Sequence, residues 1–333
     1  MTSAKLLKAI FGAGRSGTTF LGSILNTHPD IAYRFEPFHR IGRSNSTINR
    51  YKKASQDITL SEEDLLTIYN IFIQSHPLTD KPPFFPKTEY RHLSSQRLTW
   101  LLGKSLPALT PLYKILYTPR KIPALIFKEV NLENLMSKFL QQTSVPVVYM
   151  ARHPCATILS QFKGQSQKKM PASRQRVLLS LLQKHDPSLA DYYGSRLENM
   201  TELEKTTLLW RIDIEKAVAS INHSQSQGLL IFYEQICEDP HSSIQTIFQH
   251  FNLTYPEPTQ NFLDFLCSID SDSSTPKKVN NDWMNSYFTV YRNPRKQKDL
   301  WKTKILPEQR KEIEAIVKES WAFELCASQA QWD

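Results

Sequence analysis

The sequence lacks any apolar run near the roughly 18 residues that a membrane-spanning helix needs, which excludes an integral membrane protein. Its 4 cysteines are widely separated and show no Cys-x-x-Cys pair or Cys/His metal spacing, so neither a disulfide scaffold nor a metal site is expected. The N-terminus has no signal-peptide pattern, so the expected compartment is the cytoplasm. Disorder is excluded as well, because 6 Trp, 13 Tyr and 17 Phe are ample material for a hydrophobic core.

Basic residues exceed acidic ones in this chain of 333 residues. The 41 Lys and Arg against 32 Asp and Glu give a net charge of +9. Such an excess favours anionic partners such as phosphates, sulfates or acidic surfaces. The charge is dispersed along the chain, and no recognition-helix, RNA-binding or zinc-finger pattern accompanies it. A nucleic-acid partner is therefore not expected.

Apolar runs with the length of buried strands alternate with segments of helical periodicity. Strands are expected at residues 5–11, 31–36, 124–130, 146–152 and 229–236. Helices are expected at 17–26, 61–75, 132–143, 154–162, 174–184, 202–223, from 240 onward and at 307–325. This alternation predicts an α/β fold with a parallel sheet flanked by helices on both faces and ligands at the carboxyl ends of the strands. The Pro-rich, basic stretch 77–123 is expected to be irregular.

A glycine-rich loop with the sequence GAGRSGTT follows the first expected strand, from Gly12 to Thr19. Its glycines allow positive φ and let backbone N–H groups close on an anion. The helix that follows directs the positive end of its dipole at the same point. The loop therefore predicts an anion site, and the remaining question is which anion it binds.

Two familiar nucleotide loops fit this spacing in part. Gly12, Gly14 and Gly17 satisfy the dinucleotide fingerprint G-x-G-x-x-G, with Glu36 19 residues farther on, so an NAD(P)-dependent oxidoreductase is one alternative. A cation inside the turn, Arg15, argues against it. A triphosphatase P-loop shares the outer glycine spacing, but a threonine stands in place of its essential lysine. Phosphoryl transfer needs that lysine and a metal aspartate, and both are missing.

The third interpretation is a relative of the P-loop whose cation has moved forward to Arg15. The stretch GAGRSGTTFLGSILNTHPDI resembles the 5′-phosphosulfate-binding loop of sulfotransferases that use 3′-phosphoadenosine 5′-phosphosulfate (PAPS), especially the carbohydrate and tyrosylprotein branches. The resemblance implies PAPS as co-substrate, adenosine 3′,5′-bisphosphate as product and no metal. It also implies a P-loop-type single domain over 1–333, with irregular insertions near 40–123 and 164–200. The loop residues implied to contact the donor are Gly14, Arg15, Ser16, Gly17, Thr18 and Thr19.

Later segments extend the resemblance. Arg152 and Ser160 lie about two helical turns apart in RHPCATILS, where they can face one anion, and this segment resembles the 3′-phosphate-binding pattern R-x-P-x5-S of the family. The segment LLIFYEQICEDP resembles the family's strand before a Y-E-x-L helix and implies Tyr233 near the 3′ side of the donor. SYFTVYRNPRKQKDLWKTKIL resembles its C-terminal segment. That segment offers a closing wall formed by Ser286, Arg292, Trp301 and Lys302.

Sulfuryl transfer needs a base for the acceptor's proton, cations for the developing charge and a holder for the leaving phosphate. Glu36 is the expected base, working through a raised pKa or through substrate-assisted positioning, and His39 is the second candidate. Arg15 would clamp sulfuryl and 5′-phosphate oxygens, and Lys128 could reach the transferring group. The acceptor is expected to be a carbohydrate, a small alcohol or a peptide that offers a hydroxyl or an amine. A non-catalytic nucleotide-binding protein is the other alternative.

Overall fold

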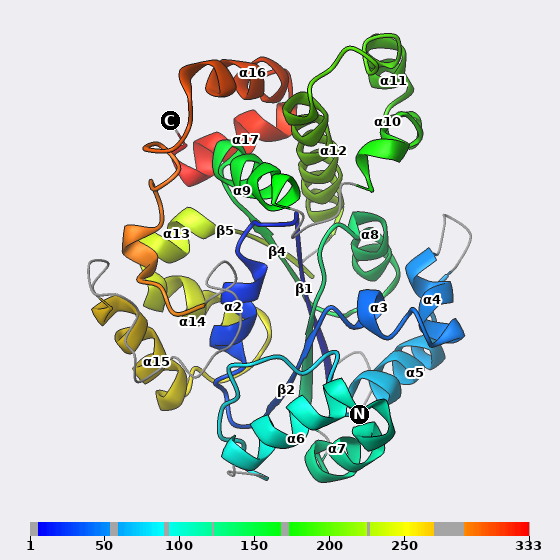
Figure 1. Cartoon of the computed structure of the whole chain (residues 1–333), viewed down its shortest axis with the longest axis vertical. Helices are drawn as coiled ribbons and strands as arrows, with labels where there is room; N and C mark the ends of the chain where they lie inside the picture. The colour runs from blue at the N-terminus through cyan, green and yellow to red at the C-terminus, as the bar shows by residue number, and fades with distance from the viewer. Residues whose placement is uncertain are drawn as a thin grey trace.

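The computed structural model describes residues 6–53, 59–89, 93–121, 123–167, 173–224, 227–269 and 290–332. At its centre is a sheet of five strands: β1 (Leu7–Gly12), β2 (Ile31–Phe35), β3 (Ala124–Lys128), β4 (Val147–Ala151) and β5 (Gly228–Phe232). The strand order is β2-β3-β1-β4-β5, and every neighbouring pair is parallel (Figure 1). The predicted parallel α/β fold is confirmed.

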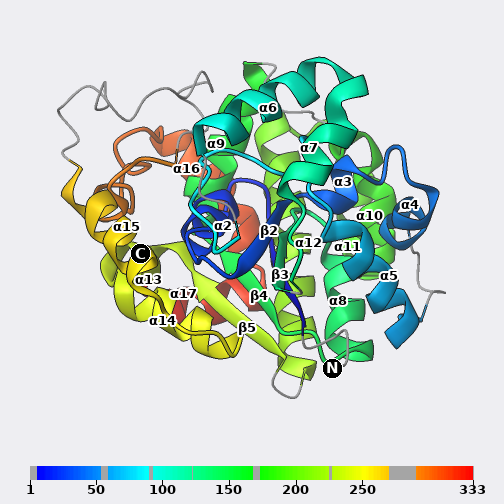
Figure 2. The same cartoon turned by 90° about the horizontal axis from the view of Figure 1, so that it is seen from below.

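Alternate side chains along each strand enter two separate cores, one on each face of the sheet. In β1, Ala9 and Phe11 join one core, whereas Ile10 joins the other. The Ile10 face is covered by α2 (Thr18–Leu25), α13 (Tyr233–Glu238), α14 (Pro240–His250) and α15 (Glu257–Ser268). The Phe11 face is covered by α3 (Pro37–Arg40), α4 (Ser46–Lys53), α5 (Glu62–Phe72), α8 (Glu133–Gln142), α9 (Pro154–Ser166), α12 (Glu202–His223), α16 (Pro307–Val317) and α17 (Trp321–Ala330). Helices on both faces are thus confirmed (Figure 2).

The Pro-rich stretch 77–123 was expected to be irregular, and this is wrong from residue 93 onward, where regular helices occur. The stretch near 164–200 contains the helix predicted at 174–184 and a further helix. Together the two stretches hold α6 (Leu93–Ser105), η1 (Pro107–Leu109), α7 (Thr110–Tyr117), η2 (Gln175–Val177), α10 (Leu178–His185) and α11 (Pro187–Gly194).

Two of the prolines that suggested irregular chain, Pro107 and Pro111, lie in first helical turns, as does Pro187. Proline is accepted there because the missing N–H would have no partner inside the helix. The prolines at 77, 82, 83 and 86 lie outside helices.

Two element boundaries also differ from the prediction. The last strand ends at Phe232, and the residues YEQI that were assigned to it begin α13, where the Gln235 side chain accepts from the Phe232 N–H at 3.3 Å. The C-terminal helix is divided into α16 and α17, with buried Ser320 at the N-cap of α17. A short 3-10 turn, η4 (Pro294–Lys296), precedes α16.

The parallel sheet places the carboxyl ends of all five strands at one edge, where each strand delivers a candidate residue. The glycine loop leaves central β1, and Arg152 and Tyr233 follow β4 and β5 on one side of it. Lys128 ends β3 and Glu36 follows β2 on the other side. The two halves of the sheet therefore bring different parts of the site to the central loop.

Candidate active site

The glycine loop turns from β1 into α2 through two residues with positive φ, Arg15 at 75° and Gly17 at 103°. Gly14 N–H donates to Asn131 Oδ1 at 2.8 Å, so the segment after β3 supports the loop from outside. A side chain at Gly17 would have its Cβ 2.6 Å from Tyr233 Cδ2, a separation that real Cβ atoms do not adopt. The loop therefore needs glycine there both for its backbone angle and for its close approach to α13.

The structure brings the four anion-site candidates Arg15, Arg152, Ser160 and Tyr233 into one corner. Arg15 Nε donates to Ser160 Oγ at 2.9 Å, and Arg152 Nη1 donates to the Arg15 carbonyl at 3.4 Å. The Arg152 guanidinium lies 4.2 Å from the centre of the Tyr233 ring, within range for a cation–π contact. Two segments about 135 residues apart in the sequence therefore share one basic corner.

Two polar atoms of this corner are buried without a hydrogen-bond partner among the described residues. They are Ser16 Oγ and Arg152 Nε. Buried donors in folded proteins are nearly always paired, so such atoms call for an explanation. An anion held at the corner would supply acceptor oxygens for donors of this kind.

Glu36 is the first residue after β2 and has φ of 52°. Its carboxylate accepts from Lys128 Nζ at 2.6 Å and lies 3.4 Å from Arg40 Nη2. Burial raises the pKa of Glu36, but the charge and hydrogen bond of Lys128 outweigh it, and Arg40 adds to them, so the pKa falls to about 2. Of the two expectations for Glu36, the raised pKa is therefore wrong, because the carboxylate is ionised and paired with Lys128 and Arg40.

The second candidate base lies elsewhere. His39 Nδ1 is 2.6 Å from Oε2 of the fully buried Glu129, and the same carboxylate accepts from the Phe38 N–H at 2.5 Å. Burial raises the pKa of Glu129, and contact with His39 partly offsets that rise. His39 is absent from the cavity lining, whereas Glu36 is part of it. The geometry thus favours Glu36 over His39.

A cavity of about 1160 Å³ opens at the carboxyl edge of the sheet. The predicted site residues that line it are Gly14, Arg15, Gly17, Thr18, Thr19, Glu36, Lys128, Arg152, Ser160, Tyr233, Arg292 and Trp301. Its described lining holds nine Lys and Arg against two acids: Arg15, Arg40, Lys81, Lys104, Lys128, Arg152, Lys163, Arg292 and Lys304 against Glu36 and Asp80. A wall with this charge excess concentrates anions.

Besides His39, three predicted residues are not part of this lining or are not described. Ser16 is buried beneath the loop. Lys302 pairs with Asp299 at 3.1 Å and does not line the cavity, so its assignment to the closing wall is not supported. Its neighbour Trp301 does line it and stacks on His153 with ring centres 4.2 Å apart. Ser286 lies outside the described residues.

Sequence reasoning missed the part of the cavity wall that comes from residues 77–104. Lys81 Nζ lies 4.1 Å from the centre of the Phe35 ring, and Lys128 Nζ lies 4.2 Å from the same centre. Burial, with the nearby Lys128, lowers the pKa of Lys81 to about 7. Trp100 and Lys104 of α6 complete this wall. No local motif marks these residues; only the basic character of 77–123 pointed to them.

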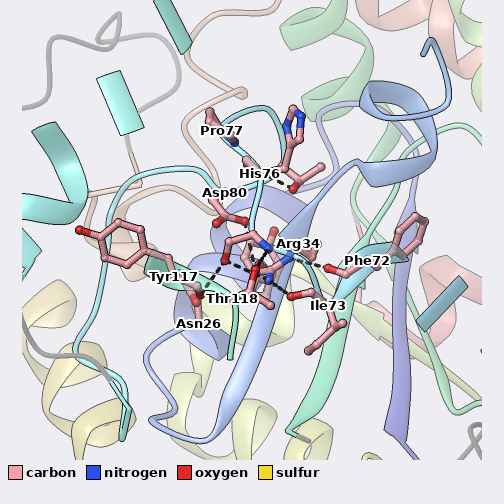
Figure 3. A network of polar contacts seen from close by, with 12 residues as sticks. Asn26, Arg34, Phe72, Ile73, His76, Pro77, Asp80, Tyr117 and Thr118 are labelled. Atoms are coloured by element: carbon pink, nitrogen blue, oxygen red, sulfur yellow. Dashed lines mark hydrogen bonds and ion pairs between the residues drawn. The ribbon is translucent and has the colours of Figure 1, made fainter. Parts of the chain in front are cut away.

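Arg34 fixes the chain that carries this wall (Figure 3). Its guanidinium donates to the Phe72 carbonyl at 2.7 Å and the Ile73 carbonyl at 2.6 Å, and it lies 3.2 Å from Asp80 Oδ1. The other oxygen of Asp80 accepts from Tyr113 OH at 3.0 Å. Arg34 and Asp80 are both buried, so this ion pair anchors the segment leading to Lys81 against β2 and α7.

None of the described helices is long and apolar enough to cross a bilayer. Within the described ranges, no group of three or more His, Cys, Asp or Glu side chains is placed to hold a metal ion. The dinucleotide interpretation loses its acidic residue, because Glu36 is bound to Lys128 instead of standing free for a ribose hydroxyl.

Several solved structures are similar to this chain. The sulfotransferase domain from the curacin biosynthetic pathway is 14% identical, with a TM-score of 0.49 and 98% of each chain covered. The sulfotransferase domain from the Synechococcus PCC 7002 olefin synthase is 15% identical, with a TM-score of 0.45 and coverage of 93% of this chain and 94% of the other. Mouse sulfotransferase SULT7A1 complexed with PAP is 12% identical, with a TM-score of 0.44 and coverage of 99% and 90%.

No curated protein matches the chain by sequence. The sequence model of the sulfotransferase family, Sulfotransfer_3, matches residues 9–257, which is more than half of the chain. This span includes the glycine loop, Glu36, Lys128, Arg152 and Tyr233. The chain therefore belongs to the sulfotransferase family.

Proposed function

We propose that the protein transfers a sulfuryl group from PAPS to a hydroxyl or amine acceptor. The observation that carries this proposal is the cavity at the carboxyl edge, where an ionised carboxylate, the arginines of the basic corner and the glycine loop meet in a strongly basic lining. Membership of the sulfotransferase family and its relative crystallised with PAP are consistent with that donor. We also propose that 1–333 acts as one domain, and a cytoplasmic location stays a prediction.

The residues of the basic corner fit a donor with anions at both ends of its ribose. Gly14, Gly17, Thr18 and Thr19 would offer backbone N–H and hydroxyl donors to the 5′ end, at the start of α2. Arg152, Ser160 and Tyr233 would hold the 3′-phosphate, and Arg15 would reach oxygens at the 5′ end. The buried, unpartnered Nε of Arg152 supports this assignment.

Glu36 acts as the base in this proposal. It takes the proton of the acceptor hydroxyl or amine while the acceptor atom bonds to sulfur. The bond from sulfur to the 5′-phosphate oxygen breaks, and its electron pair leaves on adenosine 3′,5′-bisphosphate. Arg15 and Lys128 stabilise the charge that develops on the oxygens around sulfur.

The ion pair with Lys128 explains how a carboxylate with a pKa of about 2 becomes a useful base. Burial alone would raise the pKa of Glu36, and Lys128 is the main group that opposes it. An anionic sulfuryl group in the cavity competes with Glu36 for the Lys128 ammonium. When Lys128 turns toward that group, Glu36 loses its strongest stabilising partner and becomes more basic.

We assign the protein to the carbohydrate and tyrosylprotein side of the family. The loop RSGTT and the position of Glu36 after HPDIAYRF support this assignment, together with the separation of His39 from the cavity. The acceptor enters on the wall of Leu78, Lys81, Trp100 and Lys104. Carbohydrates, small alcohols and peptides all remain candidate acceptors for that wall.

Binding and transfer test the proposal separately. Adenosine 3′,5′-bisphosphate should raise the melting temperature, and NAD(H) and NADP(H) should not. The changes Arg15→Ala and Arg152→Ala should each weaken bisphosphate binding by more than about tenfold, or about 1.4 kcal/mol, in calorimetric titration. Arg196→Ala is the matched control, since this exposed arginine lies outside the cavity lining.

The base is tested with labelled PAPS and a panel of acceptor classes. Glu36→Gln should retain bisphosphate binding and lose transfer, whereas His39→Gln should keep transfer. Unchanged bisphosphate affinity in both arginine variants would refute the donor site. Tight binding without transfer to any acceptor class would identify a nucleotide-binding protein that is not an enzyme.

A further inference from the structure

The helices α6 and α7, with the turn between them, carry a high density of exposed apolar side chains. Of the fifteen large hydrophobic side chains exposed in the described chain, seven fall within 98–116. Ile115 is 76% exposed and Leu98 is 59% exposed. We define the α6–α7 apolar face as Leu98, Leu101, Leu102, Leu106, Leu112, Ile115 and Leu116. Scattered exposed leucines are ordinary, but a cluster of this density marks an interaction surface.

This face is presented by a firmly packed hairpin. The inner sides of both helices contribute Trp100, Tyr113 and Tyr117 to a small buried core that also contacts Phe84. Trp100 Nε1 donates to the carbonyls of Pro77 at 2.9 Å and Asp80 at 2.7 Å. Because the aromatic sides face inward, the helical spacing turns the leucines outward.

Charge around the α6–α7 apolar face has one sign. Between 93 and 121 the sequence has five basic residues and no Asp or Glu: Arg97, Lys104, Lys114, Arg120 and Lys121. Glu89 lies beside the end of this segment, where its carboxylate accepts from the backbone N–H groups of Arg120 and Lys121 at 2.6 and 2.8 Å. Exposed leucines beside a basic rim are the composition of helices that lie in the interface of anionic bilayers.

We propose that the α6–α7 apolar face docks the protein on the surface of a bilayer that contains anionic lipids. The leucines enter the boundary between headgroups and acyl chains, and the basic rim contacts the headgroups. Both figures place α6 and α7 at the periphery, and the two helices contact one another (Figure 1, Figure 2). Trp100 and Lys104 of α6 also line the cavity, so docking holds the acceptor wall next to the bilayer. The proposal does not depend on sulfuryl transfer.

Vesicle co-flotation of the full chain tests this proposal. Vesicles of phosphatidylcholine with phosphatidylserine should retain the protein at least about tenfold better than vesicles of phosphatidylcholine alone. Added NaCl should weaken the binding, because the headgroup contacts are electrostatic and screened by salt. Equal binding to both vesicle types would overturn the role of the basic rim, and absence of binding would overturn the proposal.

Single substitutions test whether the α6–α7 apolar face is the surface that binds the vesicles. Ile115→Glu and Lys114→Glu should each reduce binding to the anionic vesicles by about tenfold or more. Leu179→Glu is the matched control: Leu179 is exposed on α10, which lies far from α6 and α7 in Figure 1, and this variant should bind normally. Melting curves and bisphosphate binding of each variant verify that the fold and the donor site are intact.

The alternative to a bilayer is that a second copy of this chain covers the α6–α7 apolar face. Sedimentation velocity without vesicles would then show a concentration-dependent dimer that Ile115→Glu abolishes. A dimer of this kind, in a protein that ignores anionic vesicles, would replace bilayer docking with self-association.

Discussion

At the scale of single residues, Glu36 is governed by two opposing effects. Burial acts to neutralise the carboxyl, and the ammonium of Lys128 at 2.6 Å acts to keep it ionised. The second effect is stronger. Glu36, the side chain proposed to take a proton, is thus held in an ion pair. Any group that draws Lys128 away also raises the pKa of Glu36.

The first prediction concerns the pH dependence of stability. The folded protein holds the pKa of Glu36 at about 2, below the ordinary 4.5. Because the folded value is the lower one, the ion pair stabilises the fold above pH 4.5 and loses this contribution as the pH falls toward 2. Glu36→Gln should therefore lower the free energy of unfolding by about 3 kcal/mol at pH 7 and by far less near pH 3.

Urea denaturation at the two pH values measures this difference. Lys128→Met combined with Glu36→Gln should recover part of the loss, because the single change Glu36→Gln leaves the buried ammonium of Lys128 without its carboxylate. A loss from Glu36→Gln that is the same at pH 7 and pH 3 would contradict the ion-pair explanation.

The second prediction contrasts two glycines of the same loop. Gly17→Ala imposes a side chain at φ of 103° and places its Cβ 2.6 Å from Tyr233, so stability should fall by about 2 kcal/mol or more. Gly14→Ala has its nearest neighbour, Asn131, at an ordinary 3.5 Å and should cost less than about 1 kcal/mol. Thermal and urea melts measure both changes, and equal losses would argue against the strained turn.

At the scale of elements, the segment after α5 is held by polar contacts made by β2. Arg34 binds the carbonyls at the end of α5 and the carboxylate of Asp80, while Tyr113 brings α7 to the same carboxylate. Burial raises the pKa of Asp80, and Arg34 is the main group that counteracts this. One arginine of the sheet therefore sets the position of the acceptor wall.

The third prediction removes that anchor. Arg34→Met leaves Asp80 buried without its cation and should destabilise the protein by about 3 kcal/mol. Arg34→Met with Asp80→Asn should be more stable than Arg34→Met alone, because the uncompensated charge is gone. The double variant should bind bisphosphate normally and show an altered KM for the acceptor. A double variant no more stable than the single one would contradict this account of the wall.

At the scale of the whole molecule, charge is concentrated where the strands end. The described cavity lining holds nine basic side chains and two acids, although the chain as a whole carries just +9. The excess exceeds what a single anion site needs. It produces a positive potential that attracts the donor before contact.

The fourth prediction is a salt dependence of donor binding. The affinity for adenosine 3′,5′-bisphosphate should fall by roughly tenfold between low salt and physiological salt, because ions screen the cavity. Adenosine, which carries no phosphate, should bind weakly at both salt concentrations. Calorimetric titration in a chloride series measures this slope, and an affinity that does not respond to salt would show that the cavity charge contributes nothing.

The sequence predicts the parts of the site that local chemistry defines. A strand, three glycines, Arg15 and two threonines are contiguous, so the loop can be identified without knowing what surrounds it. Arg152 and Ser160 are also local, since one helix carries the serine two turns beyond the strand end. These residues lie together because parallel strands end at one edge.

The remaining parts depend on contacts between distant segments. His39 is only three residues from Glu36, yet Pro37 starts the short helix α3 and the histidine turns toward Glu129. The pKa of Glu36 depends on Lys128, 92 residues away. Lys81 and Trp100 reach the cavity beside Asp80, which pairs with Arg34 through its carboxylate and accepts from Trp100 through its carbonyl. No periodicity or spacing in the sequence predicts these contacts.

The central strand β1 separates two groups of site residues. On one side of it, β4 and β5 lead to Arg152 and Tyr233 of the basic corner. On the other side, β3 ends at Lys128 and β2 leads to Glu36, and residues 41–121 lie between β2 and β3 in the sequence. Under the proposed function, the wall that contacts the acceptor and the corner that holds PAPS therefore lie on opposite sides of β1. Substitutions in that wall would then change the choice of acceptor and leave the residues proposed to hold PAPS in place.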